Sequence, residues 1–213
     1  KINLHIQKGR IYGFLGPNGA GKSTTMKMFL GLTAPTSGSF SVNGKTYPKD
    51  RREILRETGS FIESPAYYGN LTGEENLQII QQILKLPKSS VKEVLELTGL
   101  YEHRRRPVSK YSLGMKQRLG LAGALMGHPP VLILDEATSS IDTRTEKIVQ
   151  DGMDKLMKGR TTFVIAHRLS TVRNADCIVV IEHGEIMEKG SHTELLEEKG
   201  RYYQLYTGQF ELD

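Results

Sequence analysis

The segment from Gly16 to Ser23 has the residue types and spacing of a loop that holds phosphate groups. It reads GPNGAGKS and matches the pattern G-x-x-x-x-G-K-[ST] in full. Glycines let the backbone fold tightly, so that its N–H groups face phosphate oxygens. A helical pattern that begins near Lys22 adds the positive end of a helix dipole. The residues expected to contact a nucleotide here are Gly16, Asn18, Gly19, Ala20, Gly21, Lys22, Ser23 and Thr24.

Three side chains of this segment have separate expected roles. Lys22 can reach the β- and γ-phosphates, the Ser23 hydroxyl can bind Mg²⁺, and Thr24 can contact a phosphate nearby. The alternative is a glycine-rich turn that matches the pattern by chance. An apolar strand pattern before the loop and a helical pattern after it make that alternative the weaker one.

Two adjacent carboxylates, Asp135 and Glu136, follow the apolar run VLIL at residues 131–134. Such a run predicts a strand buried on both faces, and the carboxyl ends of strands in open α/β sheets line the ligand site. We expect Asp135 to hold Mg²⁺ through a water molecule and Glu136 to polarise the water that attacks the γ-phosphorus. The alternative, a polar strand end that caps the next helix, is weakened by the presence of the phosphate loop.

The elements that position these residues are predicted by short apolar runs that alternate with helical patterns. This alternation indicates βα units and a mostly parallel sheet. The predicted core strands span residues 11–15, 59–62, 131–134, 162–165 and 178–181, and the predicted helices around them span 22–30, 143–157 and 168–173. Asn43-Gly44 and His183-Gly184 predict tight turns between antiparallel strands. Ser191 and Glu194 predict a capping box.

The stretch from about residue 63 to 111 has a different character, because its apolar residues follow a helical period and prolines punctuate it. One expected helix face carries Leu77, Ile80, Ile83 and Leu84. A second expected face carries Val91, Val94, Leu95 and Leu97. We interpret this stretch as an inserted helical subdomain.

The composition is that of a globular domain. The chain has 213 residues, 25% of them charged, and a net charge of +5, which suits anionic partners without requiring nucleic acid. No apolar run approaches the roughly 20 residues of a membrane-spanning helix, and no signal peptide is evident. We therefore expect any membrane part to come from another chain. Cys177 is the single cysteine, expected to be a buried thiol in a reducing compartment.

A further motif distinguishes among families that use a phosphate loop. Residues 111–118, YSLGMKQR, resemble the signature sequence of ABC ATPases, whose usual core is LSGGQ. The resemblance covers the whole chain in the expected order: phosphate loop, helical insert, signature, acidic strand end, the Ser140–Asp142 loop, then His167 after a strand. It implies an α/β fold: a P-loop NTPase (RecA-like) core at 1–62 and 116–213 with a mostly parallel sheet, a small antiparallel β region, and an inserted α-helical signature subdomain at 63–115.

The resemblance also implies a mechanism. By this resemblance, the chain would form a head-to-tail dimer in which the signature of one subunit closes on the ATP held by the other. Ser112, Gly114 and Gln117 would then face the partner's nucleotide, His167 would contact the γ-phosphate and hold Glu136 in line, and Asp142 would lie at the dimer seam. The implied function is ATP binding and Mg²⁺-dependent hydrolysis that powers export through separate transmembrane domains, on the cytoplasmic face of the membrane, with no nucleic acid involved.

Three features depart from the family pattern. Glu63 stands where a glutamine that touches Mg²⁺ is usual, and its surroundings resemble bacitracin and lantibiotic exporter cassettes. The aromatic residue that usually stacks on adenine is expected upstream of residue 1, and Tyr12 is expected to serve packing instead. Residues 136–213 resemble multidrug and lipid exporter cassettes rather than the bacitracin group. We therefore hypothesise an engineered chimera that recombines two cassettes near Asp135.

Two other functions remain open at this level. One is a soluble ABC ATPase that acts on nucleic acid or the ribosome, although such proteins resemble paired cassettes or carry long inserts. The other is a stably folded protein with little activity, in keeping with the mixed resemblance and the absent adenine stack.

Overall fold

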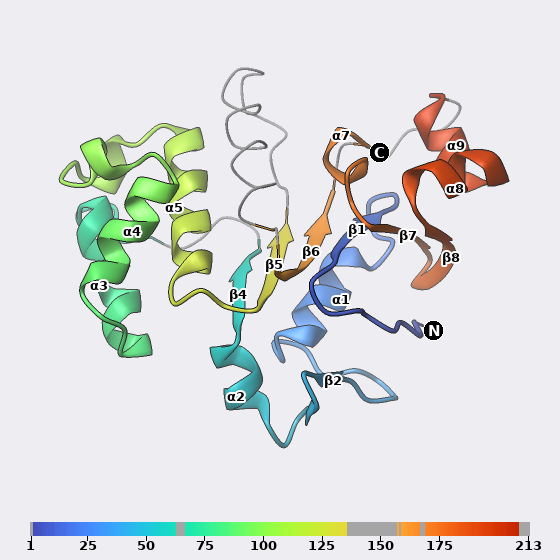
Figure 1. Cartoon of the computed structure of the whole chain (residues 1–213), viewed down its shortest axis with the longest axis horizontal. Coiled ribbons are helices and arrows are strands. Elements are labelled where there is room, and N and C mark those ends of the chain that lie inside the picture. The colour runs from blue at the N-terminus through green and yellow to red at the C-terminus, as the bar shows by residue number, and fades with distance from the viewer. Residues whose placement is uncertain (1, 63–66, 136–156, 158, 167–168, 209–213) are drawn as a thin grey trace.

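A six-stranded sheet forms the centre of the protein in this computed structural model, which describes residues 2–62, 67–135, 157, 159–166 and 169–208 (Figure 1). The strands lie in the order β4-β5-β6-β1-β7-β8. Their bounds are β1 (Ile11–Leu15), β4 (Thr58–Phe61), β5 (Val131–Asp135), β6 (Thr161–Ile165), β7 (Cys177–Glu182) and β8 (Glu185–Gly190). All pairs are parallel except β7–β8. The predicted α/β fold with a mostly parallel sheet is confirmed.

Helices cover both faces of the sheet, which explains why β5 is buried along its whole length. Alternate residues of a strand point to opposite faces. Phe14 accordingly joins a cluster with Met26 of α1 (Lys22–Phe29), whereas Leu15 joins a cluster with Leu195 of α8 (His192–Glu198). The second face is also covered by α5 (Leu113–Leu125), α7 (Leu169–Val172) and α9 (Arg201–Tyr206).

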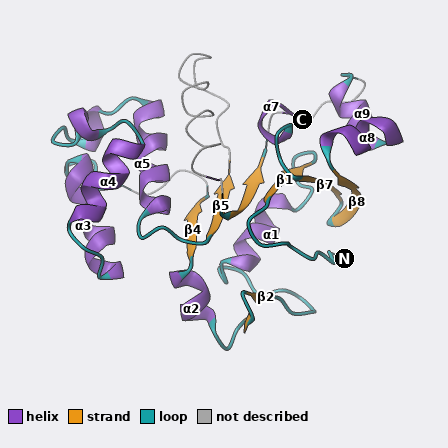
Figure 2. Cartoon of the chain, in the orientation of Figure 1, coloured by secondary structure: helices purple, strands orange, loops and turns teal. Residues whose placement is uncertain are grey.

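The helical part lies at the β4 end of the sheet (Figures 1 and 2). It contains α3 (Gly73–Leu84), α4 (Ser89–Leu97) and the short 3-10 turns η1 (Tyr101–His103) and η2 (Val108–Lys110). Helix α3 begins with a capping box, in which the Thr72 hydroxyl accepts from the Glu75 N–H (3.2 Å) and the Glu75 carboxylate accepts from the Thr72 N–H (2.7 Å). Helix α5 contacts α3 and α4 on one side and β4 on the other, so it joins the helical part to the sheet.

The predicted helix faces are wrong at their ends. Leu77, Val91, Val94 and Leu95 are buried, but Ile83 is 73% exposed and Leu97 is 45% exposed. A helix turns about 100° per residue, so Ile83 lies about 120° around the axis from Leu77. Leu84, the last residue of α3, is also exposed. Apolar spacing alone therefore overstated the width of the buried stripe.

The predicted turns and caps are confirmed. The pair β2 (Ser41–Val42) and β3 (Lys45–Thr46) is antiparallel and leads into α2 (Arg51–Arg56). Between β7 and β8, His183 (φ 48°) and Gly184 (φ 74°) form a two-residue turn of left-handed residues. Ser191 accepts from the Glu194 N–H at the start of α8. Of the helix predicted at 143–157, only Met157 is among the described residues.

Candidate functional site

The phosphate loop begins in direct backbone contact with β7. Gly16 has φ +151°, and a side-chain carbon at this position would overlap the main-chain carbonyl oxygen of Ile181. Glycine is therefore required at position 16 by space as well as by backbone conformation. This contact fixes the start of the loop at the carboxyl end of the central strands.

The rest of the loop is held at its base and open at its tip. The Ala20 N–H donates to the Pro17 carbonyl (3.2 Å), and the Ala20 carbonyl accepts from the Gly184 N–H (3.0 Å). Ala20 is buried, whereas Asn18 and Gly19 are exposed. The backbone around Asn18 is therefore accessible to a ligand while its anchor points are fixed.

Helix α1 starts directly after the loop. Gly21 (φ 99°) is its N-cap, and the Gly21 carbonyl accepts from both the N–H (2.9 Å) and the hydroxyl (2.8 Å) of Thr25. The N–H groups of the first turn, from Lys22 to the exposed Thr24, have no acceptor within the helix. Together with the helix dipole they form a site for an anion.

Lys22 supplies a buried positive charge. It is 5% exposed and, among the residues that the structure describes, the only lysine or arginine that is buried. Its ammonium group donates to the carbonyls of Gly16 (2.6 Å) and Pro17 (3.0 Å). Burial lowers the pKa of Lys22 below its ordinary value, while the charge of Asp135 acts in the opposite direction. A buried ammonium favours a bound anion, so these residues fit a nucleotide phosphate.

Ser23 and Asp135 meet beside this charge. The Ser23 hydroxyl lies 3.2 Å from Oδ2 of Asp135, which is 5% exposed at the end of β5. Hydroxyl and carboxylate oxygens are ligands that Mg²⁺ accepts. The pair therefore fits a magnesium ion that accompanies a bound nucleotide.

The signature residues lie elsewhere in the chain. Ser112 is exposed and caps α5, where its hydroxyl accepts from the Met115 N–H (3.3 Å); Gly114 and Gln117 follow in the same helix. Helix α5 packs on β4, which is three strands away from β1 in the sheet (Figure 1). Within one chain, the signature and the phosphate loop are therefore separate.

Four predicted site residues, Glu63, Glu136, Asp142 and His167, lie outside the described residues. The described neighbours of three of them lie at the carboxyl ends of β4, β5 and β6. These neighbours are Ile62, Asp135 and Ala166. Since the three strands are parallel and adjacent, their carboxyl ends share the edge of the sheet that carries the phosphate loop.

The sequence did not predict that residues of β7 and the turn after it support the loop. Ile181 and Gly184 contact Gly16 and Ala20, yet the sequence pattern predicted only a strand and a turn there. No local signal marks these contacts, because they depend on the parallel pairing of β1 with β7.

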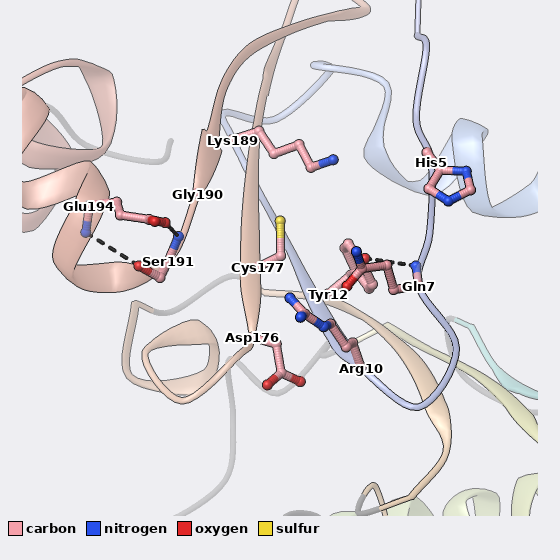
Figure 3. A pocket seen from close by; sticks show the side chains of 10 residues that line it. All are labelled: His5, Gln7, Arg10, Tyr12, Asp176, Cys177, Lys189, Gly190, Ser191 and Glu194. Carbon is pink, nitrogen blue, oxygen red and sulfur yellow. Dashed lines mark hydrogen bonds between the residues drawn. The ribbon is translucent and has the colours of Figure 1, made fainter.

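A hollow lies at the opposite edge of the sheet from the phosphate loop, where β7 begins and β8 ends (Figure 3). Three of its polar side chains bind the backbone of the chain itself. The Tyr12 hydroxyl accepts from the Gln7 N–H (2.9 Å), Asp176 accepts from the Ile11 N–H (2.7 Å), and Glu194 accepts from the Ser191 N–H (2.7 Å). Cys177 lines this hollow and is buried, as predicted, and burial raises the pKa of its thiol. We therefore interpret the hollow as structural.

The fold and the phosphate loop together define a nucleotide-binding domain of the P-loop class. Residues 1–139 match the family described as ABC transporter, and the chain belongs to this family. It is therefore an ATP-binding, ATP-hydrolysing domain, as the sequence predicted.

Individual relatives come from both branches that the sequence resembles. The chain is 43% identical to the bacitracin transport ATP-binding protein of Enterococcus faecalis, over 95% of this chain and 67% of that protein. It is 38% identical to the ATP-dependent lipid A-core flippase of Ralstonia nicotianae, over 98% of this chain and 37% of that protein. A solved bacterial Atm1-family ABC exporter with ATP bound is similar with a TM-score of 0.85 and 28% identity, over 96% of this chain and 38% of that one.

The chain thus spans about two thirds of the length of the bacitracin protein and under two fifths of the other two. Within its described residues, every helix is too short or too polar to cross a bilayer.

Proposed function

We propose that this chain binds Mg²⁺–ATP on the Gly16–Ser23 loop and, paired head to tail with a second cassette, hydrolyses it to power export through transmembrane domains at the cytoplasmic face of a membrane. The observation that carries the proposal is the buried Lys22 ammonium beside the Ser23–Asp135 contact. These three side chains come from one loop and one neighbouring strand end, and together they match the charge and ligand requirements of a metal-bound triphosphate.

Each residue has a role in this proposal. Gly16, Asn18, Gly19 and Gly21 present backbone N–H groups, Lys22 neutralises the β- and γ-phosphates, and Thr24 adds a phosphate contact. Ser23, Asp135 and Glu63 hold Mg²⁺, which when bound neutralises charge on the phosphates. Glu136 acts as general base toward the attacking water, and His167 keeps it in line. Asp142 links the two sites of the dimer.

The position of the signature supports a second subunit. Ser112 sits exposed at the N-terminus of α5, where N–H groups and the helix dipole favour an anion. Because α5 and the phosphate loop are separate within one chain, Ser112, Gly114 and Gln117 serve the nucleotide of a partner. A head-to-tail dimer brings the two halves together.

A groove of about 450 Å³ between β4, α3 and α5 supports the proposal that the chain contacts a transmembrane domain. Three exposed apolar side chains, Leu32, Tyr68 and Leu84, line it. The groove lies beside β4, the edge strand of the sheet. An apolar groove of this kind suits a short helix from the transmembrane domain, so we assign it that occupant.

The test is ATP turnover of the purified chain across protein concentration. A rise of specific activity with concentration supports the dimer, and activity independent of concentration contradicts it. Lys22→Ala should abolish nucleotide binding, whereas Glu136→Gln should lower turnover roughly 10²- to 10⁴-fold with binding retained. Stimulation of turnover by nucleic acid would instead favour the soluble alternative.

A further inference from the structure

The turn between β7 and β8 lies against the phosphate loop. The Gly184 N–H donates to the Ala20 carbonyl (3.0 Å), and a side-chain carbon on Gly21 would lie 3.7 Å from Gly184 Cα. Ile181, three residues before Gly184, contacts Gly16 through its carbonyl oxygen. The hairpin therefore supports both the start and the end of the loop.

The same hairpin is also bound by α9. Glu182, the last residue of β7, is 8% exposed, and its carboxylate accepts from Nε of Arg201 (2.8 Å). Arg201 also donates through Nη1 to the Gln204 side chain (3.0 Å). A buried carboxylate depends on such a cation, because an uncompensated charge in the interior is costly.

Helix α9 has a second attachment that does not involve the turn. The Glu188 carboxylate of β8 accepts from the N–H groups of Arg201 and Tyr202, the latter at 2.9 Å. Gly200 makes room for this carboxylate, since a side-chain carbon there would overlap it. Glu188 therefore anchors α9, whereas Glu182 joins α9 to the strand end next to the phosphate loop.

We infer that Glu182 and Arg201 are positioning residues of the nucleotide site, through which α9 controls the affinity of the phosphate loop. Glu182 pairs with Glu185 across the two-residue turn, so a shift of Glu182 reaches Gly184, and through its N–H the Ala20 carbonyl, within one tight hairpin. Loss of Arg201 also leaves a negative charge near a site for phosphate. Coupling is reciprocal, so nucleotide binding must in turn stabilise α9. The inference rests on the proposed nucleotide site.

The experiment compares Arg201→Gln with Glu188→Gln as a matched control for anchoring of α9. For each variant, the Kd for Mg²⁺–ATP and the Tm are measured. We expect Arg201→Gln to weaken binding about 5- to 150-fold, the usual range of coupling between sites. Glu188→Gln should lower the Tm without changing the Kd. In the double variant Arg201→Gln/Glu182→Gln, part of the affinity should return, because the uncompensated charge is gone.

Equal changes of Kd in the Arg201→Gln and Glu188→Gln variants, or an unchanged Kd in a folded Arg201→Gln variant, would overturn the inference. A wild-type chain without affinity for Mg²⁺–ATP contradicts the proposed function instead. In that case the inference can still be tested by measuring amide hydrogen exchange of the protein without nucleotide. Arg201→Gln should speed exchange of the Ala20 and Gly21 amides relative to Glu188→Gln, and equal rates would refute the link to the loop.

Discussion

The Ser23 hydroxyl donates to the Asp135 carboxylate over 3.2 Å, although the two residues are 112 positions apart in the sequence. The contact joins the first turn of α1 to the end of β5, and it places two oxygen ligands where the loop faces the sheet edge. Whether these oxygens bind a metal can be tested directly.

Asp135→Asn should abolish the gain in nucleotide affinity that Mg²⁺ provides, because an amide replaces the anionic ligand. Binding of ADP in the presence of EDTA should survive, since the loop and Lys22 are unchanged. Paired titrations with and without Mg²⁺ measure this difference. The matched control is Glu188→Gln, which neutralises a carboxylate of β8 that holds α9 and should keep the Mg²⁺ effect. An Asp135→Asn variant that retains the full effect would exclude Asp135 as a ligand.

As the pH rises, the affinity for nucleotide should begin to fall at a lower pH than it would if Lys22 had the usual pKa of a lysine. Burial lowers the pKa of Lys22 from 10.5, so the ammonium loses its proton below that value. The site is charged below the lowered pKa, and it loses this charge as the pH rises through it. Asp135 raises the pKa of Lys22, so the Asp135→Asn variant should lose affinity at a still lower pH. Affinity that stays constant up to about pH 10 would contradict a lowered pKa.

The same pKa shift acts on folding with the opposite sign. Between the lowered pKa and 10.5, the unfolded chain holds a proton on Lys22 that the folded chain has released. The Lys22 contribution to the free energy of unfolding therefore increases with pH over this window. Urea unfolding of the wild type and of Lys22→Met, compared across the window, isolates this contribution.

Gly16→Ala should destabilise the protein more than Gly19→Ala. Both glycines have positive φ, which costs about 1–3 kcal/mol for other residues. A side-chain carbon at Gly16 also overlaps the Ile181 carbonyl, whereas no atom of the described residues lies within 4 Å of one at Gly19. Overpacking adds about 1–3 kcal/mol. Denaturant titration measures both variants, and equal losses would show that the loop can move away from β7.

Tyr67→Phe should lower stability by about 0.5–1.5 kcal/mol through loss of a hydrogen bond. The Tyr67 hydroxyl donates to the Lys116 carbonyl in α5 (3.0 Å), and burial raises the pKa of this hydroxyl. Tyr68→Phe is the matched control, since Tyr68 is 61% exposed and should change stability little. If both variants unfold at the same denaturant concentration as the wild type, the bond contributes nothing.

The features that sequence predicted well are those encoded locally. The phosphate loop, the buried run before Asp135 and the capping box of Ser191 each depend on neighbours within a few residues. The order of the strands and the contact of Gly184 with Ala20 depend on pairings between distant segments, for which a single sequence carries no signal. Ile83 and Leu97 were wrongly assigned to the buried faces of their helices, because the assignment used their apolar character and did not consider their angular position around the helix axis.

The recombination hypothesis remains a hypothesis. Relatives of the bacitracin type and of the lipid flippase type each align over more than nine tenths of the chain. Such alignments follow from the fold that both branches share, so they do not locate a junction at Asp135.

The place of β1 between β6 and β7 also has a consequence for synthesis on the ribosome. Residues 11–23 emerge early, yet the strands that flank β1 and the carbonyl that Gly16 contacts come from residues 161–182. A nascent chain that ends before β7 therefore lacks the contacts that hold its phosphate loop in place. Nucleotide would then bind only to chains whose synthesis has continued beyond β7. A prematurely terminated chain would not be stabilised against proteolysis by bound nucleotide.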